Sequence, residues 1–162
     1  MANFTTETFK IHDDYMTPKS AWENIQHLIP RNKVIWEAFF GDGKSGTHLK
    51  DLGFETVHEP IDFFENDLGD IIVSNPPFTK IKEVLQRLLI INKPFILIMP
   101  SSKINTQYFR GMFKDKKIQL IIPPKRIQFI KLPFDPKNSL SCNFDCFYYC
   151  YQMDLENDIT WI

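Results

Sequence analysis

The chain has 162 residues, of which 43% are hydrophobic and 24% are charged, and its formal net charge is −1. This length suits one domain and is too short for two well-packed ones, so we expect a single domain over residues 1–162. Because no apolar run approaches the roughly 20 residues of a membrane span and no signal-peptide pattern opens the chain, we expect a soluble intracellular protein without a membrane partner.

The first half of the chain predicts alternating helices and strands. Thr17 and Pro18 predict the N-cap and first residue of a helix that Pro30 ends. The apolar stretch 33–40 predicts a short buried strand and "GDGKSG" a loop. A helix over 47–53, closed by Gly53, and a strand over 54–58 follow.

The second half continues the alternation. A strand over 71–75 precedes a helix for which Thr79 is the expected N-cap, and a strand over 95–100 follows Pro94. One helix is expected within 101–117 and a strand over 118–122. The segments 126–132 and 144–153 predict two strands joined as a long hairpin. This pattern predicts an α/β fold with a mostly parallel, doubly wound, Rossmann-like sheet that ends in an antiparallel hairpin.

Ligands of such sheets bind beyond the carboxyl ends of the strands, near the point where strand order reverses. Glu37 follows the first predicted strand and would face a cationic or hydroxyl-bearing group, while Gly41 and Gly43 would let the backbone approach a ligand closely. The spacing is neither the dinucleotide fingerprint nor a P-loop. The alternative is a simple turn.

Acidic and aromatic side chains follow the second predicted strand. Glu59 is placed to accept hydrogen bonds from a ribose. Asp62 is placed to accept from an adenine amino group, and Phe63 to cover its ring. We expect the neighbouring Phe64 to lie in the core.

The segment "NPPF" follows the strand over 71–75. The Asn75 amide oxygen and the Pro76 carbonyl would together hold an –NH2 group on a planar base. Pro76 and Pro77 fix φ at successive residues, which gives the rigid geometry that such a grip needs. Phe78 would then stack on the base.

Four motifs, in this order, carry a resemblance: "YMTP" (15–18), "WEAFFGDG" (36–43), "DFF" (62–64) and "NPPF" (75–78). They resemble the S-adenosylmethionine-dependent amino-methyltransferases, in particular the small adenine-N6 DNA methyltransferases of phages and large viruses. "KRIQFI" and "CNFDCFYY" near the end are similar to the family's last strands. The resemblance implies methyl transfer to the N6 amine of adenine in DNA, by base flipping and direct attack, in the cytoplasm or inside an infected host cell.

The resemblance also implies residue roles. Asn75, Pro76, Pro77 and Phe78 correspond to the catalytic loop, and Phe129 to an aromatic residue that packs on the flipped base. Contacts to the S-adenosylmethionine cofactor correspond to Tyr15, Thr17, Glu37, Phe39, Gly41, Gly43, Glu59, Asp62 and Phe63. Ala38 stands where proline is usual, and the short gap between Glu59 and Asp62 leaves open which acid contacts the ribose.

Charge is distributed unevenly along the chain. Residues 1–78 carry six Lys and Arg against thirteen Asp and Glu, residues 79–137 carry thirteen against three, and residues 138–162 carry four acids and no base. A basic side of the molecule built from residues 79–137 would suit the phosphate backbone of a nucleic acid. We expect this nucleic acid to be DNA rather than RNA. We expect the phosphate contacts to come from Arg110, Lys114, Lys116 and Lys117. The alternative is an ordinary solvated helix face.

Other acceptors and roles stay open. RNA adenine, a guanine amine or a protein glutamine would suit the same grip, although the basic segment argues against glutamine. A noncatalytic nucleic-acid-binding or partner-binding subunit of the same fold is a further alternative. The chain has no room for a separate target-recognition domain, so specificity would come from a homodimer or a partner subunit.

Cys142, Cys146 and Cys150 lie four residues apart, which places them on one face of a strand. Their odd number, without CxxC spacing or nearby histidines, argues against a disulfide framework and a zinc site. We expect reduced, partly buried thiols and no bound metal.

Overall fold

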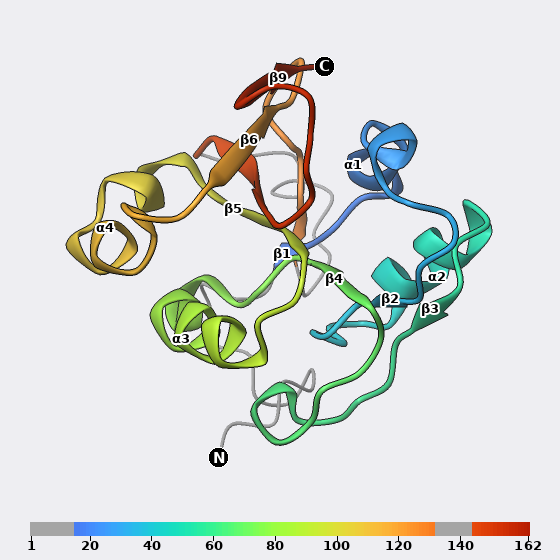
Figure 1. The fold of residues 1–162 in the computed structure, drawn as a ribbon. Coiled ribbons are helices and arrows are strands. Elements are labelled where there is room, and N and C mark those ends of the chain that lie inside the picture. The colour runs from blue at the N-terminus through green and yellow to red at the C-terminus, as the bar shows by residue number, and fades with distance from the viewer. Residues whose placement is uncertain (1–14, 132–143) are drawn as a thin grey trace.

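The computed structural model of the protein describes residues 15–131 and 144–162. Most of its strands form one seven-stranded sheet in the order β3-β2-β4-β5-β8-β6-β9, and β1 and β7 form a separate two-stranded sheet (Figure 1). The strands are β1 (Tyr15–Met16), β2 (Ile35–Trp36), β3 (Thr56–Val57), β4 (Ile71–Ser74), β5 (Phe95–Pro100), β6 (Ile118–Ile122), β7 (Ile130–Lys131), β8 (Cys146–Tyr151) and β9 (Ile159–Trp161).

The large sheet is mostly parallel. Strands β3, β2, β4 and β5 run parallel, as do β6 and β9, whereas β8 is antiparallel to both of its neighbours, β5 and β6. Every residue of β4 and β5 is buried, as expected of strands covered on both faces. The predicted mixed α/β fold with a mostly parallel sheet is therefore confirmed.

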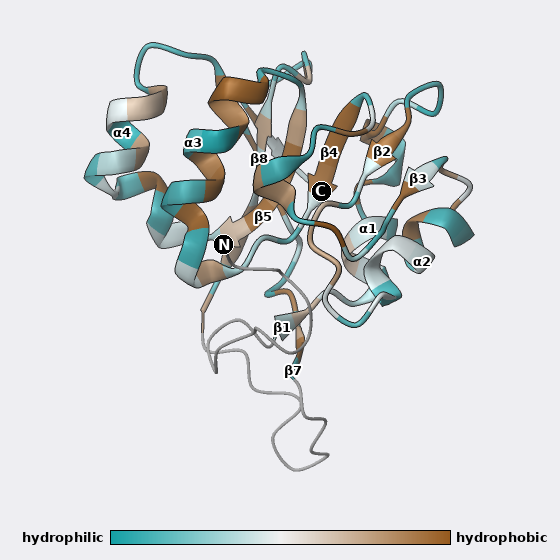
Figure 2. Cartoon of the chain, turned by 90° about the horizontal axis from the view of Figure 1, so that it is seen from below, coloured by the Kyte–Doolittle hydropathy of each residue, from teal (hydrophilic) through white to brown (hydrophobic). Residues whose placement is uncertain are grey.

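Helices cover both faces of this sheet (Figures 1 and 2). On one face, α1 (Lys19–Glu23) and α2 (Lys44–Asp51) pack Trp22 and Leu49 into the first hydrophobic cluster. On the other face, α3 (Ile81–Ile91) and α4 (Gln107–Phe113) pack Leu85 and Phe109 into the second. Short 3-10 helices lie at Gln26–Leu28, Phe63–Glu65, Phe78–Lys80 and Ser101–Asn105.

Strand order reverses beside β2. The chain passes from β2 through α2 to β3 on one side, and β4 then pairs with the opposite side of β2. The carboxyl ends of β2 and β4 therefore flank the point at which strand order reverses. Open α/β sheets bind ligands at such a point, and we call it the crevice position.

Two helices begin later than predicted. Pro18 is the N-cap of α1, so Thr17 is one residue outside the cap, and the helix ends at Glu23, well before Pro30. Lys80 is the N-cap of α3, since a 3-10 turn over Phe78–Lys80 occupies the predicted cap position Thr79. Pro77, which precedes this turn, is extended, with φ −62° and ψ 125°, so the chain passes through the 3-10 turn before it enters the α-helix.

The predicted terminal hairpin is wrong. β7 pairs with β1, while both edges of β8 are occupied by β5 and β6. Five of the six residues of β8 are buried. A strand with so many buried residues is stable in the middle of a sheet, but it is not stable in an isolated two-stranded hairpin. β9, which pairs with β6, was not predicted.

Cys146 and Cys150 are buried thiols on β8, and both belong to the first hydrophobic cluster. The expected reduced thiols on one strand face are confirmed for this pair, whereas Cys142 lies outside the described residues. Burial raises the pKa of the Cys150 thiol to about 12, so it is protonated at neutral pH.

Candidate active site at the carboxyl ends of β2 and β4

Asn75 follows the last residue of β4. Its Nδ2 donates a hydrogen bond of 3.1 Å to the backbone carbonyl of Tyr15. Its Oδ1 is buried and has no hydrogen-bond partner in the described part of the chain. Because the Tyr15 carbonyl can only accept, this bond sets the orientation of the amide and leaves Oδ1 as a free acceptor.

Four aromatic rings pack together beside Asn75. Tyr15 stacks near Phe78, with ring centroids 6.1 Å apart, and Phe129 stacks near Phe144 at 6.1 Å. Each ring of one pair meets both rings of the other edge-on, at 5.4–6.1 Å. We call these four residues the aromatic cluster.

Pairing of β1 with β7 assembles this cluster. Tyr15 lies opposite Lys131 and Met16 opposite Ile130, which brings the predicted cofactor segment beside Phe129. Phe144 was not predicted as part of the site. No local pattern marks it, because its place depends on where β8 inserts in the sheet.

Glu37 lies at the end of β2 and is 1% exposed. Its carboxylate accepts hydrogen bonds from the hydroxyls of Ser45 and Ser74 and from the Phe39 backbone N–H at 3.3 Å. Ser45 in turn accepts from the Trp22 Nε1 at 2.9 Å. The expectation that Glu37 faces a ligand is therefore wrong, because three groups of the protein already occupy its oxygens.

Burial raises the pKa of the Glu37 carboxyl, and this effect outweighs the opposing attraction of His58 and the hydrogen bonds. His58, at the end of β3, bonds through Nδ1 to the Glu37 backbone carbonyl at 2.9 Å. Glu37 at the end of β2 is thus linked to β4 through Ser74 and to α2 through Ser45. These links lie beneath the crevice position.

The glycine loop has the predicted tight geometry. Gly41 and Gly43 have φ values of +59° and +83°, which favour glycine. A Cβ at Gly41 would come within 2.8 Å of the Met16 Sδ, so β1 packs directly on this loop. Thr17 and Phe39 are buried nearby, at 4% and 5% exposure.

The residues after β3 differ from expectation. Phe63 is fully buried against Trp36 and Phe39, so the prediction that it covers an adenine ring is wrong, whereas Phe64 is half-buried and packs against the second hydrophobic cluster. The cause is the Asp62 side chain, which accepts from the Phe64 N–H at 2.8 Å and turns the chain inward at Phe63. Glu59 is exposed.

Arg110, Lys114, Lys116 and Lys117 are all exposed, on α4 and in the turn after it. Arg110, Lys114 and Lys116 line a cavity between α4 and the strands β6 and β9, and none of the four belongs to the aromatic cluster. The structure therefore groups three predicted elements at the crevice position, namely Tyr15, the glycine loop and "NPPF", together with Phe129, and keeps the basic residues apart.

In residues 15–131 and 144–162, no helix has the length and hydropathy needed to cross a membrane. The same residues contain no group of three His, Cys, Asp or Glu side chains placed to hold a metal ion. No protein-family model matches the chain, and no curated protein matches it.

Proposed function

We propose that the protein transfers the methyl group of S-adenosylmethionine to an exocyclic amino group of a nucleobase, and that this group is adenine N6 in DNA. The observation that carries the proposal is the buried, unpartnered Asn75 Oδ1. A buried acceptor without a partner costs free energy, and a site that binds an amino group gives it one.

The proposed grip explains the rigidity of the "NPPF" segment. Asn75 is anchored through its Nδ2, and Pro76 and Pro77 are buried, so Oδ1 and the Pro76 carbonyl hold fixed positions. Two acceptors on the hydrogens of an aromatic amine would favour a tetrahedral, more nucleophilic nitrogen. Fixed orientation toward the methyl donor would supply most of the remaining rate.

The aromatic cluster suits a planar acceptor. Tyr15 and Phe78 are half-buried and lie beside Asn75, so a base held by the amide would find aromatic faces, each worth about 1–3 kcal/mol in stacking. A base inside a duplex cannot reach such a site, so it would be flipped out or arrive single-stranded, and flipping costs a few kcal/mol.

The cofactor site proposed here lies over the glycine loop, in a Rossmann-like methyltransferase fold. Gly41 and Gly43 give the loop its tight turn, with Met16 and Phe40 packed against them, and Glu59, which is exposed beyond β3, would bind the ribose hydroxyls. S-adenosylmethionine supplies the activated methyl group when bound. Phe63 and Glu37 do not fit their expected contacts, because one is in the core and the other is occupied by serines.

The test is to incubate the protein with S-adenosylmethionine and, separately, duplex DNA, single-stranded DNA, RNA and a glutamine-containing peptide. The products are then digested and examined for added methyl groups by mass spectrometry. We expect N6-methyladenine in a DNA sample. Methylation of RNA, guanine or glutamine alone would correct the acceptor, and cofactor binding without any product would indicate a noncatalytic subunit.

A further inference from the structure

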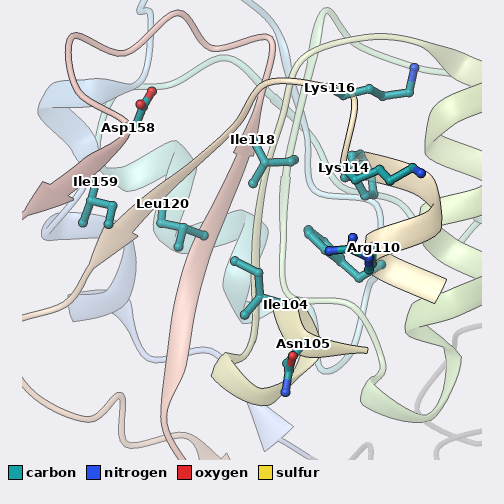
Figure 3. A pocket seen from close by; sticks show the side chains of 11 residues that line it. Ile104, Asn105, Arg110, Lys114, Lys116, Ile118, Leu120, Asp158 and Ile159 are labelled. Carbon is teal, nitrogen blue, oxygen red and sulfur yellow. The ribbon is translucent and has the colours of Figure 1, made fainter. Parts of the chain in front are cut away.

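A cavity of about 360 Å³ lies between α4 and the strands β6 and β9, within the size range of small-ligand sites. Figure 3 shows Arg110, Lys114 and Lys116 along one side of it and Asp158 and Ile159 on the other. We call this cavity the α4 groove. None of the residues assigned to methyl transfer lines it.

One wall of the α4 groove is a row of positive charges. Arg110 lies on α4 and Lys114 is the C-cap of this helix, so the two are four residues apart and lie on one face, about 5–6 Å apart at Cβ. Lys116 extends the row beyond the helix. No ion pair joins these three side chains to an acid in the described residues, and Asp158 is the one acidic residue among those lining the groove.

The opposite wall is aliphatic apart from Asp158. Ile118 from β6 and Ile159 from β9 line it, with Ile104 at one end. Ile159 is 48% exposed and Ile104 is 38% exposed, and covering such side chains is favourable by about 25 cal/mol per Å². The groove therefore suits an occupant with negative charge on one side and an apolar body on the other.

We propose that the α4 groove binds nucleotide units of the substrate strand outside the catalytic site, with phosphates on the cationic wall and sugar or base faces on the aliphatic wall. This inference rests on the proposed function. A row of uncompensated cations suits a polyanion with one charge per nucleotide better than a single small anion.

The position of the groove supports a continuous path for a strand. The 3-10 helix Ser101–Asn105 follows β5 directly and supplies Ile104 to the groove. β5 is the parallel neighbour of β4, so this helix and Asn75 both leave the carboxyl edge of the sheet. A strand held at Asn75 would pass this edge to reach the groove.

The charged wall is tested with the double variant Arg110→Gln and Lys114→Gln. Its control, Lys33→Gln with Lys50→Gln, removes two exposed lysines from the region of β2 and α2. Binding of a fluorescent 20-nucleotide single strand is measured by anisotropy at several salt concentrations. Two lost phosphate contacts should weaken binding roughly 20-fold at 0.1 M salt and flatten the log–log salt slope by about 1.4.

The aliphatic wall is tested separately with Ile159→Asn, for which Ile90→Asn on α3 is the control because Ile90 is 75% exposed and does not line the groove. We expect Ile159→Asn to weaken binding roughly fivefold to tenfold with an unchanged salt slope. Thymidine monophosphate, added as a competitor, distinguishes a free nucleotide from a strand.

Equal effects of the groove variants and their controls would overturn the proposal, as would stronger binding of the free nucleotide than of the strand. Methylation is measured on the same preparations by mass spectrometry. If methylated product forms but the groove variants bind the strand as their controls do, the proposed function stands and the α4 groove is not part of the binding site. Groove-dependent binding without any methylated product would remove the proposed function and leave a nucleic-acid-binding protein.

Discussion

The Asn75 side chain is held at its Nδ2 end and free at its Oδ1 end. The bond to the Tyr15 carbonyl makes the amide a fixed acceptor before any substrate arrives, and preorganised groups contribute to catalysis because they need not reorganise during reaction. A rotating amide would present its –NH2 half the time and repel an incoming amine.

For this reason we expect Asn75→Ala to slow methyl transfer at least about 100-fold, the usual effect of losing one preorganised hydrogen-bonding group. Cofactor binding should survive, since Asn75 touches only the acceptor in our proposal. Single-turnover rates and calorimetric titration with S-adenosylmethionine measure the two effects, and Asn32→Ala at an exposed position is the control. Full activity of the Asn75 variant would contradict the mechanism.

Glu37 makes stability depend on pH. Burial raises the pKa of its carboxyl above the ordinary value of 4.5, so the folded chain keeps this proton where the unfolded chain has lost it. The stability that this group contributes is therefore complete below about pH 4.5 and is lost as the pH rises through the raised pKa.

Glu37→Gln removes this titration and keeps the side chain's shape. We expect the melting temperature of the variant, relative to the native protein, to increase from about pH 4 to about pH 8. Glu83→Gln, at an exposed position on α3, matches the lost charge and reports the effect of net charge alone. Identical pH profiles for the two variants would show that Glu37 does not titrate as its burial implies.

At the scale of elements, two helical glycines have opposite surroundings. A Cβ at Gly46 in α2 would come within 2.1 Å of the His58 ring, whereas a Cβ at Gly111 in α4 would meet nothing within 4 Å. Gly46 is what lets α2 pack against the end of β3. Gly111 has no such role and merely weakens α4.

We therefore expect Gly46→Ala to lower the free energy of unfolding by about 1–3 kcal/mol, as overpacking does. Gly111→Ala should raise it by about 0.5–1 kcal/mol, the helix-propensity difference between the two residues. Urea denaturation measures both, and each variant serves as the other's control. A stabilising Gly46→Ala would mean that His58 moves freely.

The strands of the large sheet were predictable where apolar runs are continuous, as in β4 and β5, because burial on both faces leaves that pattern. The partner of β8 was not predictable. Its sequence satisfies a hairpin strand and a central strand equally, and only the open edges of β5 and β6 decide between them.

The candidate site was likewise predictable only in part. The "NPPF" and glycine segments follow strands, so their position was fixed by topology. The choice between Phe63 and Phe64 was not, since it depends on the Asp62 hydrogen bond to the Phe64 backbone, and two adjacent phenylalanines carry no signal for it.

At the scale of the whole molecule, the two halves of the sequence place their helices on opposite faces of the sheet. Helices α3 and α4, which belong to the basic stretch 79–137, lie on one face of the sheet, and α1 and α2 lie on the other (Figure 1). The crevice position lies at the sheet edge that both faces share.

The whole chain unfolds as a unit in our expectation, so a ligand that binds only the folded state raises its melting temperature. S-adenosylmethionine at 100 times its Kd should add about 2.7 kcal/mol, or about 5–10 °C for a chain of this size. The same shift in melting temperature can identify which acidic residue, Glu59 or Asp62, binds the ribose. Glu59 is exposed after β3, whereas one Asp62 oxygen is occupied by the Phe64 N–H.

We expect Glu59→Gln to cut the cofactor-induced shift at that ligand concentration to about half or less, because a hydrogen bond to a charged group contributes about 1.5–3 kcal/mol. Glu55→Gln is the matched control, since Glu55 is also exposed and precedes the same strand at its other end. Differential scanning fluorimetry with and without S-adenosylmethionine measures the shift. If Glu59→Gln keeps the full shift and Asp62→Asn loses it, Asp62 binds the ribose. A native protein without any shift would remove the cofactor from the proposal altogether.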